Sequence, residues 1–351
     1  MSTTKAESQE LRCNSPQALS ASSQISNDSE LSPLTQSQPW VSPPAGVSPE
    51  ARLFMNASGG IAFEMLDLKP TPLREIRDET TEIAKCKSAH VFEKLSVPRT
   101  TREETIGGVP VQRVIPQTLA GPEVVLYFFG GGFVTGSPEV DLSITATIAH
   151  YFKREVVAVR YRLSPEHSFP TAYMEAWNVY TTLHSHHHKK VFVIGQSAGG
   201  NLAVGLINRL VQSEYPLPLA VALLSPWIDL THSGDSHKTL EGLDPTLSNN
   251  FLVPAARAYA GKEKLNDPRI SPLFAEFGPT FPATVITTGT RDLLLSDCVR
   301  LASRLRSVKV PVELQITDGM WHVYEWDSML PESTRSLRNI VTFLQKYLLI
   351  E

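Results

Sequence analysis

The ten residues Val191–Gly200 constrain the fold of this chain more than any other segment. Four apolar residues typical of a buried strand lead into Gly-Gln-Ser-Ala-Gly, and apolar residues at helical spacing follow. Gly195 and Gly199 flank Ser197 at two residues on either side, where a β-carbon would crowd a sharp turn. A strand that turns this sharply into a helix lifts the serine hydroxyl above the sheet. Ser197 is therefore the candidate nucleophile.

Apolar runs of strand length alternate with helical patterns along most of the remaining chain. This alternation predicts an α/β fold with a mostly parallel, doubly wound sheet. The expected strands are Val124–Phe129, Glu155–Val159, Val191–Ile194, Leu219–Leu224, Thr284–Thr288 and Val312–Ile316. The chain is expected to end in an amphipathic helix whose apolar side carries Leu337, Ile340, Val341, Leu344 and Leu348.

Two segments interrupt this alternation. Residues 49 to about 99 are largely helical in pattern and precede the first expected strands, and Ser48 is placed to cap a helix with Pro49 at its first position. Residues 229–270 separate two core strands. Ligands bind outside the carboxyl ends of the strands in open α/β sheets, so we expect both segments to contribute a helical cap there.

The first 44 residues differ in composition from the rest of the chain. They are rich in Ser, Pro and Gln and contain too few apolar residues to offset the entropy of ordering. We therefore expect a disordered tail at 1–44 and one α/β domain at 45–351.

Composition narrows the class of partner. A net charge of −4 lacks the basic excess of nucleic-acid-binding proteins. No apolar run approaches the ~18 residues of a membrane-spanning helix, and the N-terminus lacks the apolar core of a signal peptide. Cys13, Cys86 and Cys298 have no metal-type spacing and favour a reducing compartment without a disulfide framework. The default expectation is a cytoplasmic protein.

The ends of two later expected strands carry the groups that a serine nucleophile needs. A serine hydroxyl requires an adjacent base that is itself held by a third group. Asp292 follows the strand Thr284–Thr288, and His322 follows the strand Val312–Ile316. The order serine, acid, histidine, each after a strand, predicts a triad of Ser197, Asp292 and His322.

Other titratable residues are rival candidates for catalytic or metal-binding roles. Asp297 is expected to be a helix cap or solvated surface group, and Asp318 is a second candidate for orienting His322. The histidines at 184, 186, 187 and 188 resemble a metal cluster, but no cysteine or carboxylate completes a ligand set. We expect these histidines to lie at a solvated helix end, and we predict no metal or organic cofactor.

A run of glycines follows the first expected parallel strand, at Phe129-Gly130-Gly131-Gly132. Consecutive glycines let backbone N–H groups point at a developing negative charge. We predict an oxyanion hole formed by the N–H groups of Gly131, Gly132 and Ala198.

From about Val47 to the C-terminus the sequence resembles the hormone-sensitive-lipase-like family of α/β-hydrolases. The motifs that carry the resemblance are Phe129–Gly132, Tyr161–His167, Gly195–Gly200, Leu224–Asp229 and Asp267–Leu273. Three positions depart from the family pattern. Phe129 replaces a histidine that braces the oxyanion loop, Gln196 replaces the acidic residue before the nucleophile, and Val323 stands where glycine is usual. Met320-Trp321-His322 narrows the likeness toward lactone- and small-ester-hydrolysing members.

The resemblance implies a serine hydrolase that cleaves esters or lactones of small, apolar substrates through an acyl-enzyme. A role in secondary metabolism or detoxification fits this expectation. Candidates for the wall of the substrate pocket are Phe54, Met55, Phe133, Trp227, Trp321 and Tyr324, with core packing as the alternative. Two other functions on this fold stay open: a non-catalytic small-molecule receptor, and an enzyme of acyl transfer, dehydration or cyclisation. The natural substrate and the oligomeric state stay open as well.

Overall fold

A computed structural model describes residues 41–58, 65–96, 100–185 and 190–348. The tail expected at 1–44 therefore lies almost entirely outside the described residues. The same holds for the histidines at 186, 187 and 188.

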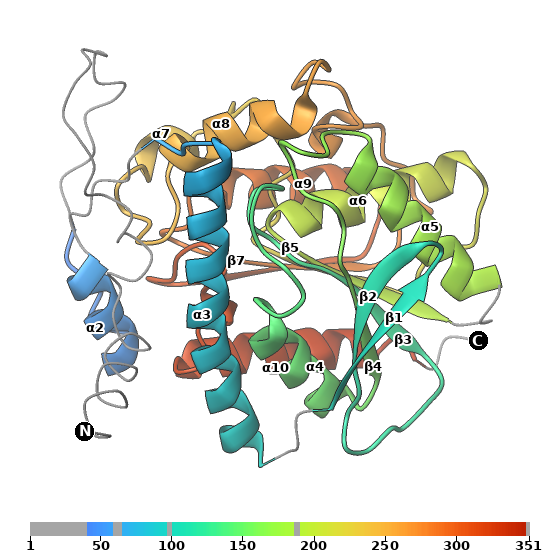
Figure 1. Cartoon of the computed structure of the whole chain (residues 1–351), viewed down its shortest axis with the longest axis horizontal. Helices are drawn as coiled ribbons and strands as arrows, with labels where there is room; N and C mark the ends of the chain where they lie inside the picture. Colours follow the sequence, from blue (N-terminus) through green and yellow to red (C-terminus); the bar gives the residue numbers. More distant parts are fainter. Residues whose placement is uncertain (1–40, 59–64, 97–99, 186–189, 349–351) are drawn as a thin grey trace.

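Eight strands form a single sheet in the order β1-β2-β4-β3-β5-β6-β7-β8 (Figure 1). Strands β3 to β8 run parallel, and β2 runs antiparallel to both of its neighbours. The bounds of β3 to β8 are Val124–Phe128, Glu155–Val159, Val191–Gln196, Val221–Leu224, Thr284–Gly289 and Val312–Thr317. All six predicted strands are present, and the predicted α/β-hydrolase fold with its mostly parallel sheet is confirmed.

The first two strands were not predicted. Strand β1 (Thr101–Ile106) and strand β2 (Val109–Val114) form an antiparallel hairpin. Its turn is Gly107-Gly108, with both glycines at positive φ. β1 is the polar, mostly exposed edge of the sheet and therefore lacks the apolar run used to find the other strands.

Helices cover both faces of the sheet. Helices α4 (Leu142–Phe152) and α10 (Pro331–Gln345) pack together on one face, and α5 (Thr171–Ser185), α6 (Ala198–Gln212) and α9 (Leu295–Ser307) lie on the other (Figure 1). The expected C-terminal helix is α10. Its residues Leu337, Ile340, Val341 and Leu344 are buried as expected, whereas Leu348 lies just beyond its end, packed against the core.

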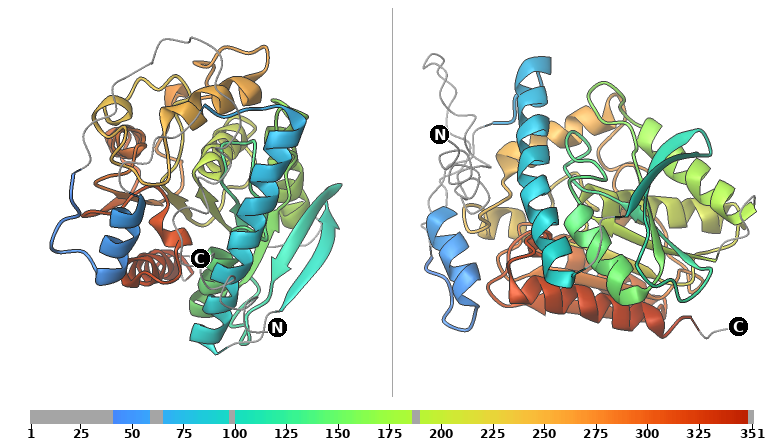
Figure 2. Two further views of the ribbon diagram at one scale, coloured as in Figure 1. Left: turned by 60° about the vertical axis from the view of Figure 1, so that its left-hand side comes forward. Right: turned by 60° about the horizontal axis from the view of Figure 1, so that its bottom comes forward.

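The N-terminal segment is helical, as expected, and forms α2 (Pro49–Ser58) and α3 (Pro70–Leu95). The Ser48 hydroxyl caps α2 by accepting a 3.1 Å hydrogen bond from the Ala51 N–H. Figure 2 shows α3 running alongside α4, with α2 set apart from it. α2 packs on the residues around His322 through a cluster of buried side chains. The members of this cluster are Val47, Ala51, Met55, Met320, Trp321, Tyr324 and Leu330.

The segment between β6 and β7 contains α7 (Ser236–Thr239) and α8 (Asn249–Ala260). Figure 1 shows both helices beside the N-terminal end of α3, and the Leu66 N–H donates to the Asn250 carbonyl at 3.1 Å. A β-carbon built on Gly132 would lie 2.7 Å from the Phe251 ring. Helix α8 therefore covers the glycine-rich loop that follows β3.

The cysteines correct one expectation. Cys86 on α3 is disulfide-bonded, whereas Cys298 is free and buried. A disulfide needs two α-carbons within roughly 7 Å, a condition set by the fold and invisible in the spacing of three cysteines. The cysteine content therefore gives no support for a reducing compartment.

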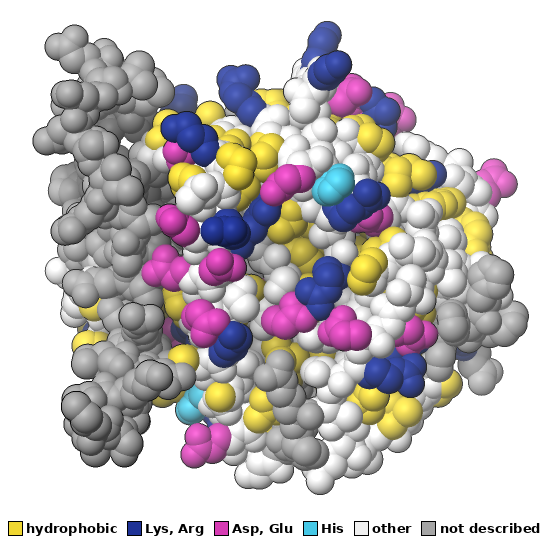
Figure 3. All heavy atoms as spheres, viewed as in Figure 1, with side chains coloured by type: hydrophobic (Ala, Val, Ile, Leu, Met, Phe, Trp, Pro, Cys, Tyr) yellow, Lys and Arg dark blue, Asp and Glu magenta, His cyan; other side chains and the backbone are white. Residues whose placement is uncertain are grey.

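The surface carries charges of both signs. Figure 3 shows acidic and basic side chains interspersed on one face, in keeping with the small net charge of −4. Within the described ranges, no helix combines the length and the apolar character needed to cross a membrane.

Candidate active site

Ser197 occupies the turn between β5 and α6. Its backbone has φ 52° and ψ −117°, a conformation that non-glycine residues adopt only when the surroundings enforce it. A β-carbon on Gly199 would overlap the carbonyl oxygen of Phe128, and one on Gly195 would overlap that of Gly199. Both flanking glycines are therefore required by close backbone approach, as the sequence predicts.

The structure brings the three predicted triad side chains together. The Nε2 atom of His322 lies 2.9 Å from the Ser197 hydroxyl, and its Nδ1 atom lies 3.1 Å from the Asp292 carboxylate. The three residues come from the loops after β5, β7 and β8, at the carboxyl ends of parallel strands. Ser197 and Asp292 are buried, and the His322 side chain is 10% exposed.

The Asp292 carboxylate is anchored on both oxygens. Oδ1 accepts from the Leu294 N–H at 2.9 Å, and Oδ2 accepts from the Thr288 hydroxyl at 2.7 Å. Burial opposes its ionisation, but His322, together with hydrogen bonds from the Ser225 hydroxyl and the Leu294 N–H, outweighs burial and lowers the pKa of Asp292. Asp292 is therefore held as a carboxylate that faces the imidazole.

The interaction between Asp292 and His322 also shifts the pKa of the imidazole. Burial disfavours the imidazolium, but the charge of Asp292 and its hydrogen bond outweigh burial and raise the pKa of His322. The imidazole is thus a stronger base than in water and is oriented with Nε2 toward the serine.

The glycine-rich loop lies beside Ser197. Gly131 and Gly132 have φ of 104° and 61°, which only glycine adopts without strain. The loop closes on itself through bonds from Val134 and Thr135 to the Gly131 carbonyl. Ala198 is the first residue of α6, where amide groups have no acceptor within the helix.

Phe129, which replaces the family histidine, is fixed by a tyrosine. The Tyr161 hydroxyl donates a 2.7 Å hydrogen bond to the Phe129 carbonyl, and the two rings stack with centroids 4.0 Å apart. Gln196 is also buried, and its amide packs directly on Gly130. The two substituted positions therefore flank the same glycine.

A buried carboxyl group lies behind this loop. Asp141 accepts a 2.8 Å hydrogen bond from the Tyr127 hydroxyl and another from the backbone of Gly130. Burial raises the pKa of Asp141 to about 7.

The proposed pocket residues are mostly packed into the interior. Phe133 stacks on Tyr259 with ring centroids 3.5 Å apart, and the ring centroids of Phe133 and Trp227 are 6.2 Å apart. Phe54 is partly exposed and stacks on Trp321 at 4.6 Å. Met55 and Tyr324 are buried in the cluster that anchors α2. These contacts give each side chain a packing role, and contact with substrate stays a proposal.

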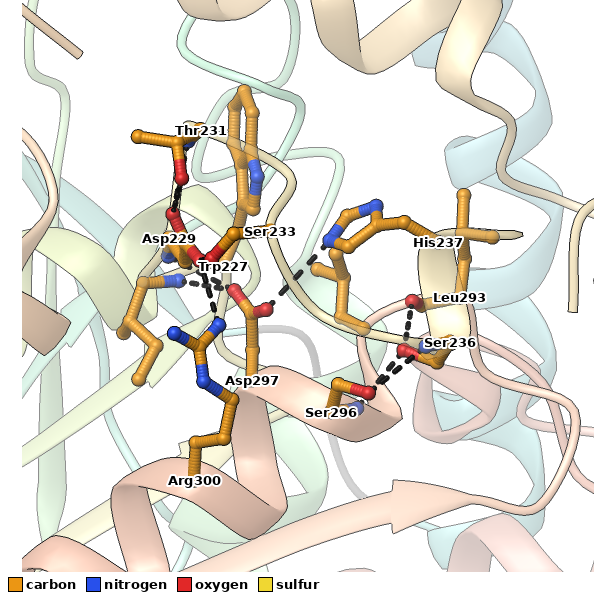
Figure 4. Close-up of polar contacts among 12 residues, drawn as sticks. Trp227, Asp229, Thr231, Ser233, Ser236, His237, Leu293, Ser296, Asp297 and Arg300 are labelled. Carbon is orange, nitrogen blue, oxygen red and sulfur yellow. Dashed lines mark hydrogen bonds and ion pairs between the residues drawn. The ribbon is translucent and has the colours of Figure 1, made fainter. Parts of the chain in front are cut away.

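Asp297 corrects a second expectation, because it is neither a solvated group nor a helix cap. It is fully buried, and its Oδ2 atom accepts from the Ile228 and Asp229 N–H groups at 3.0 and 2.9 Å (Figure 4). Its Oδ1 atom pairs with His237 Nε2 at 3.6 Å. Two serines, Ser236 and Ser296, exchange reciprocal backbone-to-hydroxyl bonds nearby. These contacts hold α7 against α9 in the interior of the protein. The prediction that Asp297 is a helix cap or a solvated surface group is therefore wrong.

Asp318 does not compete for the histidine in this structure. It is exposed, and its carboxylate accepts from the Thr290 hydroxyl at 3.3 Å. Of the histidine cluster only His184 is described, near the end of α5. No group of three or more His, Cys, Asp or Glu side chains within the described ranges is arranged to hold a metal ion.

Two residues near the triad were missed by sequence reasoning. The Ser225 hydroxyl accepts from the Val323 N–H at 3.1 Å and hydrogen-bonds to Asp292. Asp244 accepts from the N–H groups of Leu293 and His322. Ser225 follows a strand end inside a family-typical motif, which could have marked it, whereas nothing local marks Asp244.

Comparison with known proteins agrees with this architecture. Residues 125–325, more than half of the chain, match the family described as alpha/beta hydrolase fold. An esterase of Acinetobacter venetianus is 29% identical over 242 residues, covering 68% of this chain and 79% of that protein. An acetyl-hydrolase of Streptomyces hygroscopicus is 29% identical over 270 residues, covering 76% of this chain and 89% of that protein.

Solved structures give the same result. Esterase E25 superposes with a TM-score of 0.80 at 28% identity, covering 92% of this chain and all of that one. An esterase of the bacterial hormone-sensitive lipase family superposes with a TM-score of 0.74 at 26% identity, covering 84% of this chain and 95% of that one. The chain belongs to the α/β-hydrolase fold family. Within that family it is a hormone-sensitive-lipase-like member.

Proposed function

We propose that this carboxylic ester hydrolase acts through Ser197, His322 and Asp292 by way of an acyl-enzyme. The observation that carries the proposal is the continuous chain of hydrogen bonds, 2.9 Å from hydroxyl to imidazole and 3.1 Å from imidazole to carboxylate. The Ser197 hydroxyl attacks the acyl carbon while His322 Nε2 takes its proton, and that proton then passes to the leaving alcohol. His322 next activates a water molecule, which releases the acid and restores the serine.

The oxyanion formed at each step faces the backbone N–H groups of Gly131, Gly132 and Ala198. The positive φ angles of the two glycines and the place of Ala198 at the start of α6 support this assignment. Loss of one such donor typically costs on the order of 10²- to 10³-fold in turnover.

The proposed substrates are small, apolar esters or lactones. The proposed cap consists of the segments at about 49–99 and 229–270. Within it, the partly exposed Phe251 ring beside Gly132 offers an apolar surface next to the proposed oxyanion loop. Similarity to an acetyl-hydrolase favours a short acyl group. A role in secondary metabolism or detoxification and a cytoplasmic location complete the proposal. The disulfide of Cys86 counts against the cytoplasmic location.

Substitution of the serine tests the mechanism. Ser197→Ala is expected to abolish hydrolysis of p-nitrophenyl acyl esters and labelling by a fluorophosphonate probe, whereas Ser307→Ala, at an exposed residue of α9, keeps both. A Ser197→Ala protein with the wild-type rate contradicts the proposal. A wild-type protein that resists the probe favours the receptor alternative. Acyl-chain and lactone panels, with short alcohols as acceptors, then separate hydrolysis from acyl transfer.

A further inference from the structure

Asp244 lies in the segment between α7 and α8, far in sequence from the proposed triad, and is 1% exposed. Its Oδ2 atom accepts two backbone hydrogen bonds, from the Leu293 N–H at 3.1 Å and from the His322 N–H at 3.1 Å. Leu293 directly follows Asp292. One carboxylate oxygen therefore joins the loop of the triad acid to the loop of the triad base.

The other oxygen fixes Asp244 itself. Oδ1 accepts from the Thr246 N–H at 2.9 Å, the Thr246 hydroxyl at 3.0 Å and the Leu247 N–H at 3.1 Å. Five donors thus converge on one carboxylate. An amide in its place would turn an NH₂ group toward donors in either orientation and would lose bonds on one side.

We propose that Asp244 is a positioning residue of the esterase site, which sets the distance between the Asp292 and His322 loops from the proposed cap segment. The inference rests on the triad proposed above. The bond between Asp292 and His322 is only as well aligned as the two loops that carry it. Misplacement of catalytic groups by about 1 Å can cost 10²-fold in rate. The cap segment then contributes to catalysis through Asp244 in addition to any contact with substrate.

The charge of Asp244 acts on the same groups. The ionisable groups that interact with it are Asp292, from the loop after β7, and His322, from the loop after β8; Glu325 also acts on His322. From its own loop, Asp244 accepts hydrogen bonds from the neutral donors of Thr246 and Leu247. The carboxylates of Asp292, Asp244 and Glu325 all raise the pKa of His322. Burial and the charge of Asp292 raise the pKa of Asp244 itself to about 6, so Asp244 carries its charge above that pH. Removal of this charge should therefore lower the pKa of the proposed general base.

The test compares Asp244→Asn with Asp244→Glu and Asp229→Asn. Asp229 is a buried aspartate of the proposed cap segment 229–270, and it accepts hydrogen bonds from Thr231, Ser233 and Arg300. The rate of ester hydrolysis is divided by the number of active sites, which is counted by fluorophosphonate labelling. A loss of folded protein then does not lower the measured kcat. Asp244→Asn is expected to lower kcat on the order of 10- to 100-fold with little change in KM, and to move the acid limb of kcat/KM to lower pH.

The controls separate positioning from stability. Asp229→Asn should yield fewer active sites but wild-type kcat per site and a wild-type acid limb. Asp244→Glu keeps the charge, so its acid limb should stay in place while kcat per site falls at least about threefold, because the longer side chain misplaces the loops.

Wild-type kcat per site in Asp244→Asn overturns the inference. If Asp244→Asn does not fold, wild-type kcat per site in Asp244→Glu overturns it instead. A wild-type protein that fails to label at Ser197 overturns the proposed triad, an outcome distinct from either of these.

Discussion

The hydroxyl of Tyr161 donates to the backbone carbonyl of Phe129 at 2.7 Å, while the two rings stack in parallel at 4.0 Å. The family histidine at position 129 would brace the oxyanion loop with its own side chain. Here the brace comes from a neighbouring strand end, and the side chain at 129 supplies a packing surface. The loop therefore retains a fixed carbonyl immediately before Gly130.

Tyr161→Phe should lower turnover by loosening this loop. The substitution leaves the buried Phe129 carbonyl without this donor, which costs about 1–3 kcal/mol in the free energy of unfolding. We expect kcat to fall by about tenfold, because the Gly131 and Gly132 donors are less well aligned. Tyr180→Phe is the matched control, since that buried hydroxyl also donates to a backbone carbonyl, of Pro216 at 2.9 Å. Equal kcat in both variants would remove Tyr161 from the loop's support.

Asp292→Asn should both slow the reaction and shift its pH dependence. An amide favours the wrong imidazole tautomer, and the equivalent change in serine proteases lowers kcat by about 10⁴-fold. Because Asp292 raises the pKa of His322, its loss should move the acid limb of kcat/KM to lower pH. Steady-state kinetics across pH measure both effects. Asp318→Asn should behave as wild type, and a comparable loss there would reassign the triad acid.

Gly132→Ala should impair activity through two separate costs. A left-handed backbone at φ 61° disfavours alanine by roughly 1–2 kcal/mol, and the added methyl group would lie 2.7 Å from Phe251 and 3.3 Å from Ala255. Gly108→Ala carries the first cost alone, because φ is 76° there and nothing lies within 4 Å. Both variants should lose stability in urea unfolding, but only Gly132→Ala should lose kcat, by at least about tenfold. Full activity in Gly132→Ala would argue against an oxyanion role for this loop.

The sequence was sufficient for the elements whose signals are local. A buried strand that turns into a helix at Ser197 marks this serine as the candidate nucleophile. The strands that precede Asp292 and His322 end at the same edge of the parallel sheet. The proximity of Ser197, Asp292 and His322 could be predicted because the parallel topology brings the ends of these strands together. The hairpin at Gly107-Gly108 could also have been found, since two glycines between β-branched residues are a turn signal.

Other parts of the site depend on contacts that no local pattern encodes. Asp244 and Asp297 both lie in irregular or helical segments where a carboxylate is ordinary, and their role appears only when distant amide groups converge on them. For the same reason, the sequence identifies Phe133 and Trp227 as large aromatic residues but does not tell whether they line the substrate pocket or pack in the hydrophobic core. Burial is a property of the assembled layers, and strand or helix periodicity does not report it for loop residues.

Asp297→Ala should destabilise the fold strongly. The change leaves the Ile228 and Asp229 N–H groups without this acceptor, and it removes the carboxylate that lies 3.6 Å from the buried His237 ring. Breaking one partner of a buried ion pair typically costs 3–5 kcal/mol, so we expect about that loss in the free energy of unfolding. Glu263→Gln, which removes a surface partner of Arg269 at 3.5 Å, should cost less than about 1 kcal/mol. Similar losses in the two variants would show that the network of Figure 4 contributes little.

The half-buried His232 and the buried His237, both beside this network, should give stability profiles with opposite pH slopes. Burial opposes protonation of both, but Asp297 outweighs it for His237 and raises its pKa, whereas burial and His237 lower the pKa of His232 to about 4. A raised pKa adds stability that is complete below the unfolded value of about 6.5 and is lost as pH rises through the folded value. A lowered pKa has the opposite effect on stability. As pH falls from about 6.5 to about 4, the unfolded chain takes up a proton that the folded chain does not, and the folded state becomes less stable. The excess stability of wild type over His237→Gln should therefore be larger at about pH 5.5 than at about pH 9, and the excess over His232→Gln should be smaller. Urea unfolding at the two pH values measures both differences, and slopes of the same sign would show that Asp297 does not hold a proton on His237.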